Sequence, residues 1–188
     1  MKRSSAPPAG LLLIRGLGHS GSTVLDMALG AHPQMLGLGE AVRIVRKPTV
    51  SESRKGPARL RGEERFERRC TCGALAADCR VWGDFLPWLS DHDDDRDEDK
   101  FVELVHRVEE FAAQTSDQPL RWIVDSYQAD RVMPARLRDV QPSRPVKVVL
   151  LVRDVRSWAH SEVRRSRRKR LFPVLRGLLR WWRVNFLL

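Results

Sequence analysis

Short apolar runs alternate along the chain with segments whose apolar residues recur at helical spacing. A strand that is buried on both faces loses the polar alternation of a half-exposed strand and reads as a short apolar run. On this basis, strands are expected at Leu11–Ile14, Met35–Leu38, Trp122–Asp125 and Val146–Val152. Helices are expected at Ser22–Leu29, Lys100–Gln114 and Ala129–Val140, and from Ser157 onward. In the first helix, Val24, Leu25, Ala28 and Leu29 recur at helical spacing and form one apolar stripe.

The order of these elements predicts the fold class. Strand, helix and strand follow one another over residues 122–152, which is typical of a βαβ unit with parallel pairing and a right-handed crossover. We therefore expect one α/β domain over residues 11–188, with a parallel sheet and helices on both faces. A flexible segment, residues 1–10, precedes it. A Cys-containing insert is expected at about residues 46–99.

Composition excludes several classes of protein. The chain has 188 residues, of which 42% are hydrophobic and 31% charged, which suits a single domain and excludes a wholly disordered chain. No apolar run approaches the roughly 20 residues that a membrane span needs. The run Leu11–Ile14 is too short for a secretory signal and is interrupted by Arg15. A cytoplasmic location is therefore expected.

The net charge of +10 is concentrated near the C-terminus. Residues 153–183 hold eleven basic and two acidic residues, so this stretch alone carries +9. Such a patch attracts phosphates, anionic lipid or nucleic acid. Arg164–Arg170 is the candidate contact for an anionic membrane. Nucleic acid is not an expected partner, because no nucleic-acid-binding motif accompanies these arginines.

The segment Gly16–Thr23 carries the first candidate chemistry. Its spacing, G-x-x-x-x-G-S-T between a predicted strand and a predicted helix, is that of a phosphate-binding loop with Ser22 in place of the lysine. Glycines let backbone N–H groups surround an anion, and the helix start adds further donors. Loss of the lysine disfavours triphosphate hydrolysis. The simpler alternative is that the glycines only form a tight turn. The candidate anion-binding residues are His19, Ser20, Gly21, Ser22 and Thr23.

A second candidate anion site follows the strand at 146–152. Arg153 stands where ligands bind in open α/β sheets, and a guanidinium can hold a phosphate through two hydrogen bonds. Ser161 lies eight residues later and is expected to donate a hydrogen bond from the start of the next helix. The alternative is a surface arginine paired with Asp154.

Together these segments resemble the sulfotransferases that use 3′-phosphoadenosine 5′-phosphosulfate (PAPS), a superfamily with a fold like that of P-loop nucleotide triphosphatases. The resemblance rests on His19–Thr23, Ala31–Pro33, Gly39–Glu40, Cys70–Trp82 and Arg153–Arg156 with Ser161.

The resemblance implies specific roles for these residues. PAPS is the sulfuryl donor, no metal is required, and the acceptor is a hydroxyl or amine on a small molecule, glycan or lipid. Residues 19–23 hold the 5′-phosphosulfate, Arg153 and Ser161 hold the 3′-phosphate, and Glu40 is the catalytic base. Relatives continue beyond the equivalent of Leu188, so a C-terminally truncated member is expected. The alternatives are a P-loop small-molecule kinase and a non-catalytic basic protein that binds anions or lipids.

Three further features of the sequence have structural interpretations. Cys70, Cys72 and Cys79 are compatible with zinc, with a disulfide or with packed free thiols, and the spacing does not match the paired C-x-x-C of structural zinc sites. We interpret the acidic run 91–99 as the start of a helix rather than as a metal site, because acidic residues near a helix start suit its dipole. The aromatic residues of segment 82–88 are expected to form core under the insert rather than a platform for sugars.

Overall fold

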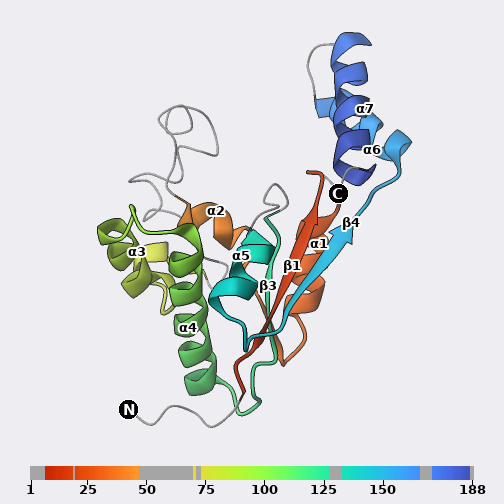
Figure 1. Ribbon diagram of the computed structural model, residues 1–188. Helices are drawn as coiled ribbons and strands as arrows, with labels where there is room; N and C mark the ends of the chain where they lie inside the picture. The colour runs from red at the N-terminus through yellow and green to blue at the C-terminus, as the bar shows by residue number, and fades with distance from the viewer. Residues whose placement is uncertain are drawn as a thin grey trace.

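The computed structural model describes residues 7–18, 20–46, 70, 73–127, 133–165 and 171–186. Its centre is an all-parallel, four-stranded sheet in the order β2-β3-β1-β4 (Figure 1). The strands are β1 (Gly10–Gly16), β2 (Met35–Gly37), β3 (Trp122–Asp125) and β4 (Val146–Leu151). The α/β class and the parallel sheet expected from the sequence are therefore confirmed.

Helices flank this sheet on both faces. They are α1 (Ser22–Gly30), α2 (Ala41–Val45), α3 (Trp82–Asp91), α4 (Asp97–Thr115), α5 (Met133–Val140), α6 (Val155–Arg165) and α7 (Leu171–Phe186), with a short 3₁₀ turn, η3 (Ala76–Asp78). The main core lies between one face of the sheet and helices α2–α5, where Leu11, Leu13 and Ile123 are fully buried against Leu104 and Leu137. Helix α1 lies behind the sheet in Figure 1. No helix in the described ranges is long and apolar enough to cross a membrane.

The expected βαβ unit differs from the prediction in its pairing. β3, α5 and β4 follow one another and the two strands are parallel, but β1 lies between them. Leu11 is in register with Ile123 on one side and with Val146 on the other. The first strand of the chain is thus central, and direct β3–β4 pairing was the wrong expectation.

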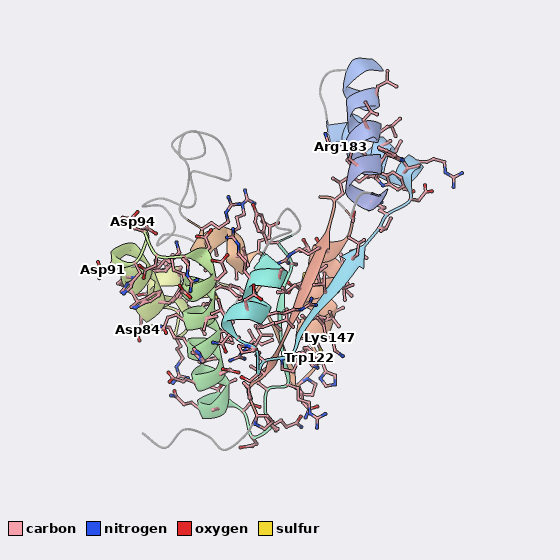
Figure 2. The ribbon with its side chains drawn as sticks, viewed as in Figure 1. Asp84, Asp91, Asp94, Trp122, Lys147 and Arg183 are labelled. Atoms are coloured by element: carbon pink, nitrogen blue, oxygen red, sulfur yellow. The ribbon has the colours of Figure 1, made fainter. Side chains whose placement is uncertain are left out.

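β4 is an edge strand in the described sheet, and its expected burial on both faces is wrong. Val148 and Leu150 are 42% and 43% exposed, and the strand ends at Leu151 rather than at Val152. An edge strand lacks a neighbour on one side, so its side chains are covered less than those of a central strand. On the other face Lys147 lies over the Trp122 ring, 5.1 Å from its centroid (Figure 2).

Helix α1 buries polar residues rather than its apolar stripe. Ser22 and Asp26 are buried, Val24 is 72% exposed, and Leu25 and Leu29 are only half-buried. The inward positions face the ends of β2 and β3, where backbone groups need polar partners. The helix predicted at Ser22–Leu29 is confirmed, but apolar spacing alone does not show which partner a short helix meets.

The acidic run is confirmed as a helix start. α4 begins at Asp97, and three acidic residues occupy its first turn, where the helix dipole favours negative charge. Lys100 is fully buried, with its Nζ atom 3.1 Å from an Asp97 carboxylate oxygen and 3.2 Å from the Asp93 carbonyl oxygen. Phe85, on α3, is fully buried in the main core, as expected for the aromatic residues of the insert.

An ion pair between the buried Arg144 and the partly buried Glu109 ties the start of β1 to α4. Glu109 accepts two hydrogen bonds from Arg144, of 2.7 and 3.0 Å, and a third of 2.8 Å from the Ala9 backbone. Arg144 also donates to the Ala9 carbonyl oxygen. Residues 1–6 of the expected flexible segment lie outside the described residues, but Ala9 is already buried and β1 begins at Gly10.

Glu109→Gln is expected to lower the free energy of unfolding at pH 7 by about 1–3 kcal/mol, because an amide nitrogen replaces one acceptor of the Arg144 bonds. Burial raises the pKa of Glu109, but the hydrogen bond and charge of Arg144 outweigh it, so the pKa lies below its usual value. The ionised carboxylate therefore stabilises the fold above pH of about 4–5, and the effect is lost as pH falls through the lowered pKa. Urea unfolding at pH 7 and pH 3.5 measures this, with the half-exposed Glu103 as the control (Glu103→Gln). A difference that persists at acid pH would contradict the account.

Candidate functional site

The predicted site residues gather at one edge of the sheet. Because the four strands are parallel, their carboxyl ends meet there, and this is where open α/β sheets bind ligands (Figure 1). The turn 17–21 follows β1, Glu40 follows β2, and Arg153 follows β4. The edge is thus built from segments far apart in sequence.

The candidate phosphate-binding loop, Gly16–Thr23, lies between a strand and a helix, as expected. β1 ends at Gly16 and α1 begins at Ser22, with Gly21 in a left-handed conformation (φ +98°) and its carbonyl oxygen accepting from the Leu25 N–H at 3.1 Å. Ser22 is buried. Among the described residues, no side chain caps α1 and none of its first-turn residues is acidic. A helix start of this kind favours an anion as its ligand.

The other residues of this segment are less enclosed. Ser20 is half-buried and Thr23 is exposed. His19 lies outside the described residues. At Gly16, which has φ +153°, an added Cβ would meet the Leu151 carbonyl oxygen, so glycine is required where β1 approaches the end of β4.

In the second segment Asp154, not Ser161, organises the helix start. Arg153 is half-buried and stands between β4 and α6. The Asp154 carboxylate accepts from the backbone N–H groups of Arg156 and Ser157, both at 3.1 Å, as an N-cap does. The Ser157 N–H contact is the main cause of the lowered pKa of Asp154. Asp154 forms an ion pair with Arg156, at 3.3 Å. The alternative, a pair between Arg153 and Asp154, stays a prediction.

Ser161 lies further along its helix than the sequence indicated, and its part in anion binding stays a prediction. Ser161 is the seventh residue of α6, and its hydroxyl donates to the Ser157 carbonyl oxygen of its own helix, at 3.0 Å. A serine in this position satisfies its hydroxyl locally.

Two tryptophans connect the residues that follow β1 with the residue that follows β4. The Trp158 indole N–H donates to the Gly18 carbonyl oxygen at 2.9 Å, and Trp181 donates to the Arg153 carbonyl oxygen at 3.0 Å. Leu17 packs against Trp158 in a small second core. The turn after β1 and the residue after β4 are thus held side by side by helices α6 and α7.

Glu40 immediately precedes α2 and is half-buried. Its carboxylate accepts a hydrogen bond from Arg43 at 2.7 Å, one turn along the helix. The Gly39 carbonyl oxygen accepts from the Ser126 N–H at 2.7 Å, which fixes the turn before Glu40 to the end of β3. Glu40 is therefore on the carboxyl edge, but separated from the first anion segment by β3.

Asp26 was missed by the sequence analysis. It is 5% exposed, and its carboxylate contacts the Ser126 side chain and the Gly39 backbone. Burial raises the pKa of Asp26, while these two contacts act in the opposite direction. Its burial could have been predicted from its position four residues after Ser22, because the two residues then share one face of the helix.

A buried ion pair, Arg15–Asp125, supports the same edge from the core side. The Nη1 atom of Arg15 lies 2.9 Å from an Asp125 carboxylate oxygen, with side-chain exposures of 5% and 0%. Asp125 also accepts from the backbone N–H groups of Val42 (3.1 Å) and Tyr127 (3.3 Å). Burial raises the pKa of Asp125, against the pull of Arg15 and these donors. These contacts give Asp125 a structural role in joining β1, β3 and α2.

One distance shows that Cys70 and Cys79 do not form a disulfide in this structure. The Sγ atoms of Cys70 and Cys79 are 3.5 Å apart, longer than the roughly 2.05 Å of a disulfide, and Cys79 is buried. Cys72 lies outside the described residues. Within the described part of the chain, no group of three His, Cys, Asp or Glu side chains is placed to hold a metal ion.

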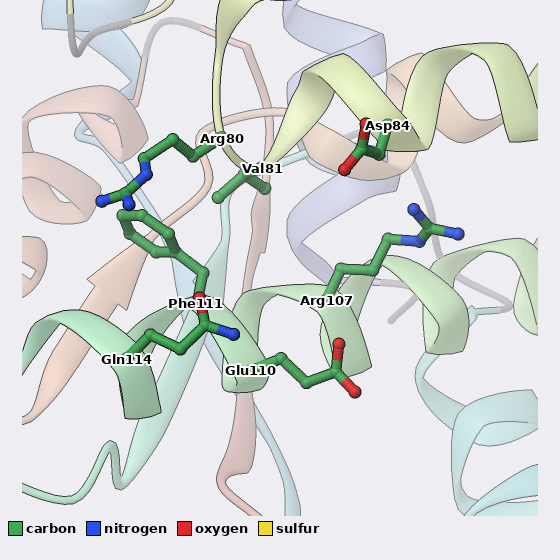
Figure 3. Close-up of a pocket in the computed structure, with 7 residues that line it drawn as sticks. All are labelled: Arg80, Val81, Asp84, Arg107, Glu110, Phe111 and Gln114. Atoms are coloured by element: carbon green, nitrogen blue, oxygen red, sulfur yellow. The ribbon is translucent and has the colours of Figure 1, made fainter. Parts of the chain in front are cut away.

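A shallow hollow of about 320 Å³ lies elsewhere, between α3 and α4 (Figure 3). Asp84 and Arg107 lie across it from one another, and the Arg80 guanidinium lies 6.0 Å from the centroid of the Phe111 ring. None of the candidate site residues lines this hollow. It is therefore separate from the carboxyl edge.

Comparison with known proteins adds no relative to this description. No model of a known protein family matches the chain, and no curated protein is similar to it at a significant level. The fold and the residues at the carboxyl edge are therefore what bear on its function.

Proposed function

We propose that this protein is a sulfotransferase that moves a sulfuryl group from PAPS to a hydroxyl or amine acceptor. One observation carries the proposal: Gly18, which follows β1, and Arg153, which follows β4, are both bonded to tryptophans of one small core, Trp158 and Trp181. Two adjacent anion-binding segments suit a donor with phosphate at both its 3′ and 5′ positions. A helix start and an arginine are the usual protein partners of phosphate groups.

Each residue has a role in this proposal. The start of α1, with Ser22 and Thr23, holds the 5′-phosphosulfate through backbone and hydroxyl donors. Arg153 holds the 3′-phosphate with its guanidinium. Ser161 remains a candidate for the 3′-phosphate from the resemblance, and its hydroxyl donates to Ser157 within α6 in this structure. His19 and Ser20 remain candidates from the sequence.

The reaction is an in-line displacement at sulfur. The acceptor oxygen or nitrogen forms a bond to sulfur, the bond from sulfur to the 5′-phosphate oxygen breaks, and 3′-phosphoadenosine 5′-phosphate (PAP) leaves. Glu40 takes the proton that the acceptor loses. The helix start and Arg153 hold the leaving group and stabilise its growing negative charge. Most of the rate enhancement then comes from positioning and charge.

Calorimetric titration with PAP tests the donor site. We expect PAP to bind more tightly than 5′-AMP and more tightly than ATP with Mg²⁺, because only PAP carries the 3′-phosphate. Preferential binding of ATP would instead favour the kinase alternative. Equal, salt-sensitive binding of every polyanion would favour a non-catalytic basic surface.

Arg153→Ala is expected to weaken PAP binding by about 10–100-fold and 5′-AMP binding by no more than about threefold, because a charged hydrogen bond to the 3′-phosphate is lost. The backbone carbonyl that Trp181 uses remains in this variant, so the fold is kept. Arg156→Ala is the matched control, because Arg156 is 89% exposed and pairs with Asp154. Equal losses for PAP and 5′-AMP would mean that Arg153 does not read the 3′-phosphate.

A further inference from the structure

The last helix carries an exposed apolar stripe. Leu175, Leu179 and Trp182 on α7 are 52%, 64% and 50% exposed. They are spaced at i, i+4 and i+7, so they share one face of the helix. Three large apolar side chains in a row on a surface mark a contact site more often than single exposed residues do.

The opposite side of α7 is the one that holds it to the protein. A Cβ at Gly177 would lie only 3.3 Å from the Trp158 ring, so this glycine lets α7 approach α6 closely. The Trp181 indole donates to the Arg153 carbonyl oxygen, as described above. Because these anchors lie on a different face, the stripe formed by Leu175, Leu179 and Trp182 points away from α6.

Positive charge adjoins this stripe. Residues 171–186 include no acidic residue, and Arg176, Arg180 and Arg183 occupy positions along one flank of the apolar stripe. Arg183 is exposed (Figure 2). Residues 153–183 carry +9 in all. An apolar helix face beside a row of arginines is the pattern of helices that lie in the interface of an anionic membrane.

The position of the two C-terminal helices suits contact with a flat surface. α6 and α7 project from the carboxyl end of the sheet, away from the body formed by α2–α5 (Figure 1). Arg176, Arg180 and Arg183 recur along α7, and arginines are costly in the hydrocarbon core of a bilayer, so this helix suits a position along a membrane rather than across it.

We propose that α7 docks on the surface of an anionic lipid bilayer. Leu175, Leu179 and Trp182 insert at the boundary between headgroups and acyl chains, and the neighbouring arginines contact lipid phosphates. A nucleic acid fits less well, because its backbone offers nothing to cover a leucine stripe. A second copy of the chain also fits less well, because two +9 surfaces repel each other. This proposal is independent of the proposed sulfuryl transfer.

Vesicle co-sedimentation tests the proposal with the full chain. We expect binding to phosphatidylcholine vesicles that contain about 30% phosphatidylglycerol, and at least tenfold weaker binding to pure phosphatidylcholine. Leu179→Glu is expected to weaken binding to the anionic vesicles by about tenfold or more, since it removes an inserted side chain and adds an opposing charge. Met27→Glu is the matched control, because Met27 is 70% exposed on α1, and it should change binding by less than about twofold.

Two further measurements distinguish an anionic bilayer from a second copy of the chain as the binding partner of this stripe. Replacing Arg176, Arg180 and Arg183 with Gln should abolish the preference for anionic vesicles while thermal unfolding stays within a few degrees. Equal binding by Leu179→Glu and the unchanged chain would overturn the proposal. So would a concentration-dependent dimer in light scattering that Leu179→Glu abolishes, because the stripe would then be an interface between copies.

Discussion

Asp125→Ala is expected to lower the free energy of unfolding by about 3–5 kcal/mol, the largest effect of any single substitution considered for stability. The variant leaves the Arg15 guanidinium buried without its carboxylate partner. It also removes the acceptor of the Val42 and Tyr127 backbone N–H groups. Urea unfolding at pH 7, followed by circular dichroism, measures the change. A loss below about 1 kcal/mol would show that the pair is not structurally important.

Substitution of the other partner of this ion pair, Arg15, is expected to lower the free energy of unfolding by an amount that depends on pH. In Arg15→Met, Asp125 loses the guanidinium that opposes the effect of burial on its pKa, so this pKa rises further. An acid with a raised pKa in the folded state holds its proton there at a pH at which the unfolded chain has lost it. The penalty of Arg15→Met therefore grows as pH rises from 5 to 8. Glu103→Ala, which breaks a half-exposed pair with Arg107, is the control and should cost less than about 1 kcal/mol at either pH.

Glu40→Gln is expected to lower the rate of sulfuryl transfer by about 10²–10⁴-fold while PAP affinity changes less than about twofold, because the proposed base is lost and the donor site is not touched. Glutamine keeps an oxygen that can accept the Arg43 hydrogen bond, so the turn before α2 is retained. Transfer of radiolabelled sulfuryl from PAPS to a panel of phenols, alcohols and amines measures the rate.

The control for Glu40 is Asp99→Asn, a half-exposed carboxylate on α4 that pairs with the exposed Arg96 at 2.7 Å and lies outside the proposed site. It should leave transfer unchanged. If Glu40→Gln turned over as fast as the unchanged chain, Glu40 would have no role as base. PAP binding without any transfer by the unchanged chain would separate a failed reaction from a failed donor site.

Much of the fold follows from local patterns. The apolar runs at 11–14 and 122–125 predict two of the four strands closely, and the helical spacing of Phe101, Leu104 and Val108 predicts α4. These patterns work because a central strand and a long amphipathic helix each need a continuous apolar surface. The carboxyl edge as the place of the candidate site follows from parallel strands alone.

Other features depend on contacts between distant segments, which no local pattern contains. The position of β1 between β3 and β4 is one of these, and it leaves Val148 and Leu150 on an edge. The burial of Asp26 is another, because its partners come from the ends of β2 and β3. Ser161 was assigned by its spacing from Arg153, but its hydroxyl bonds within its own helix.

The central position of β1 also has a consequence for how the protein is made. β1 is synthesised before both of its partners, and Trp122–Asp125 and Val146–Leu151 follow it by more than one hundred residues. Pairings of such high sequence separation form slowly. During synthesis the apolar segment Leu11–Ile14 therefore has no strand partners until residues 122–151 have been made. Apolar segments that lack their partners in this way are the ones most exposed to aggregation.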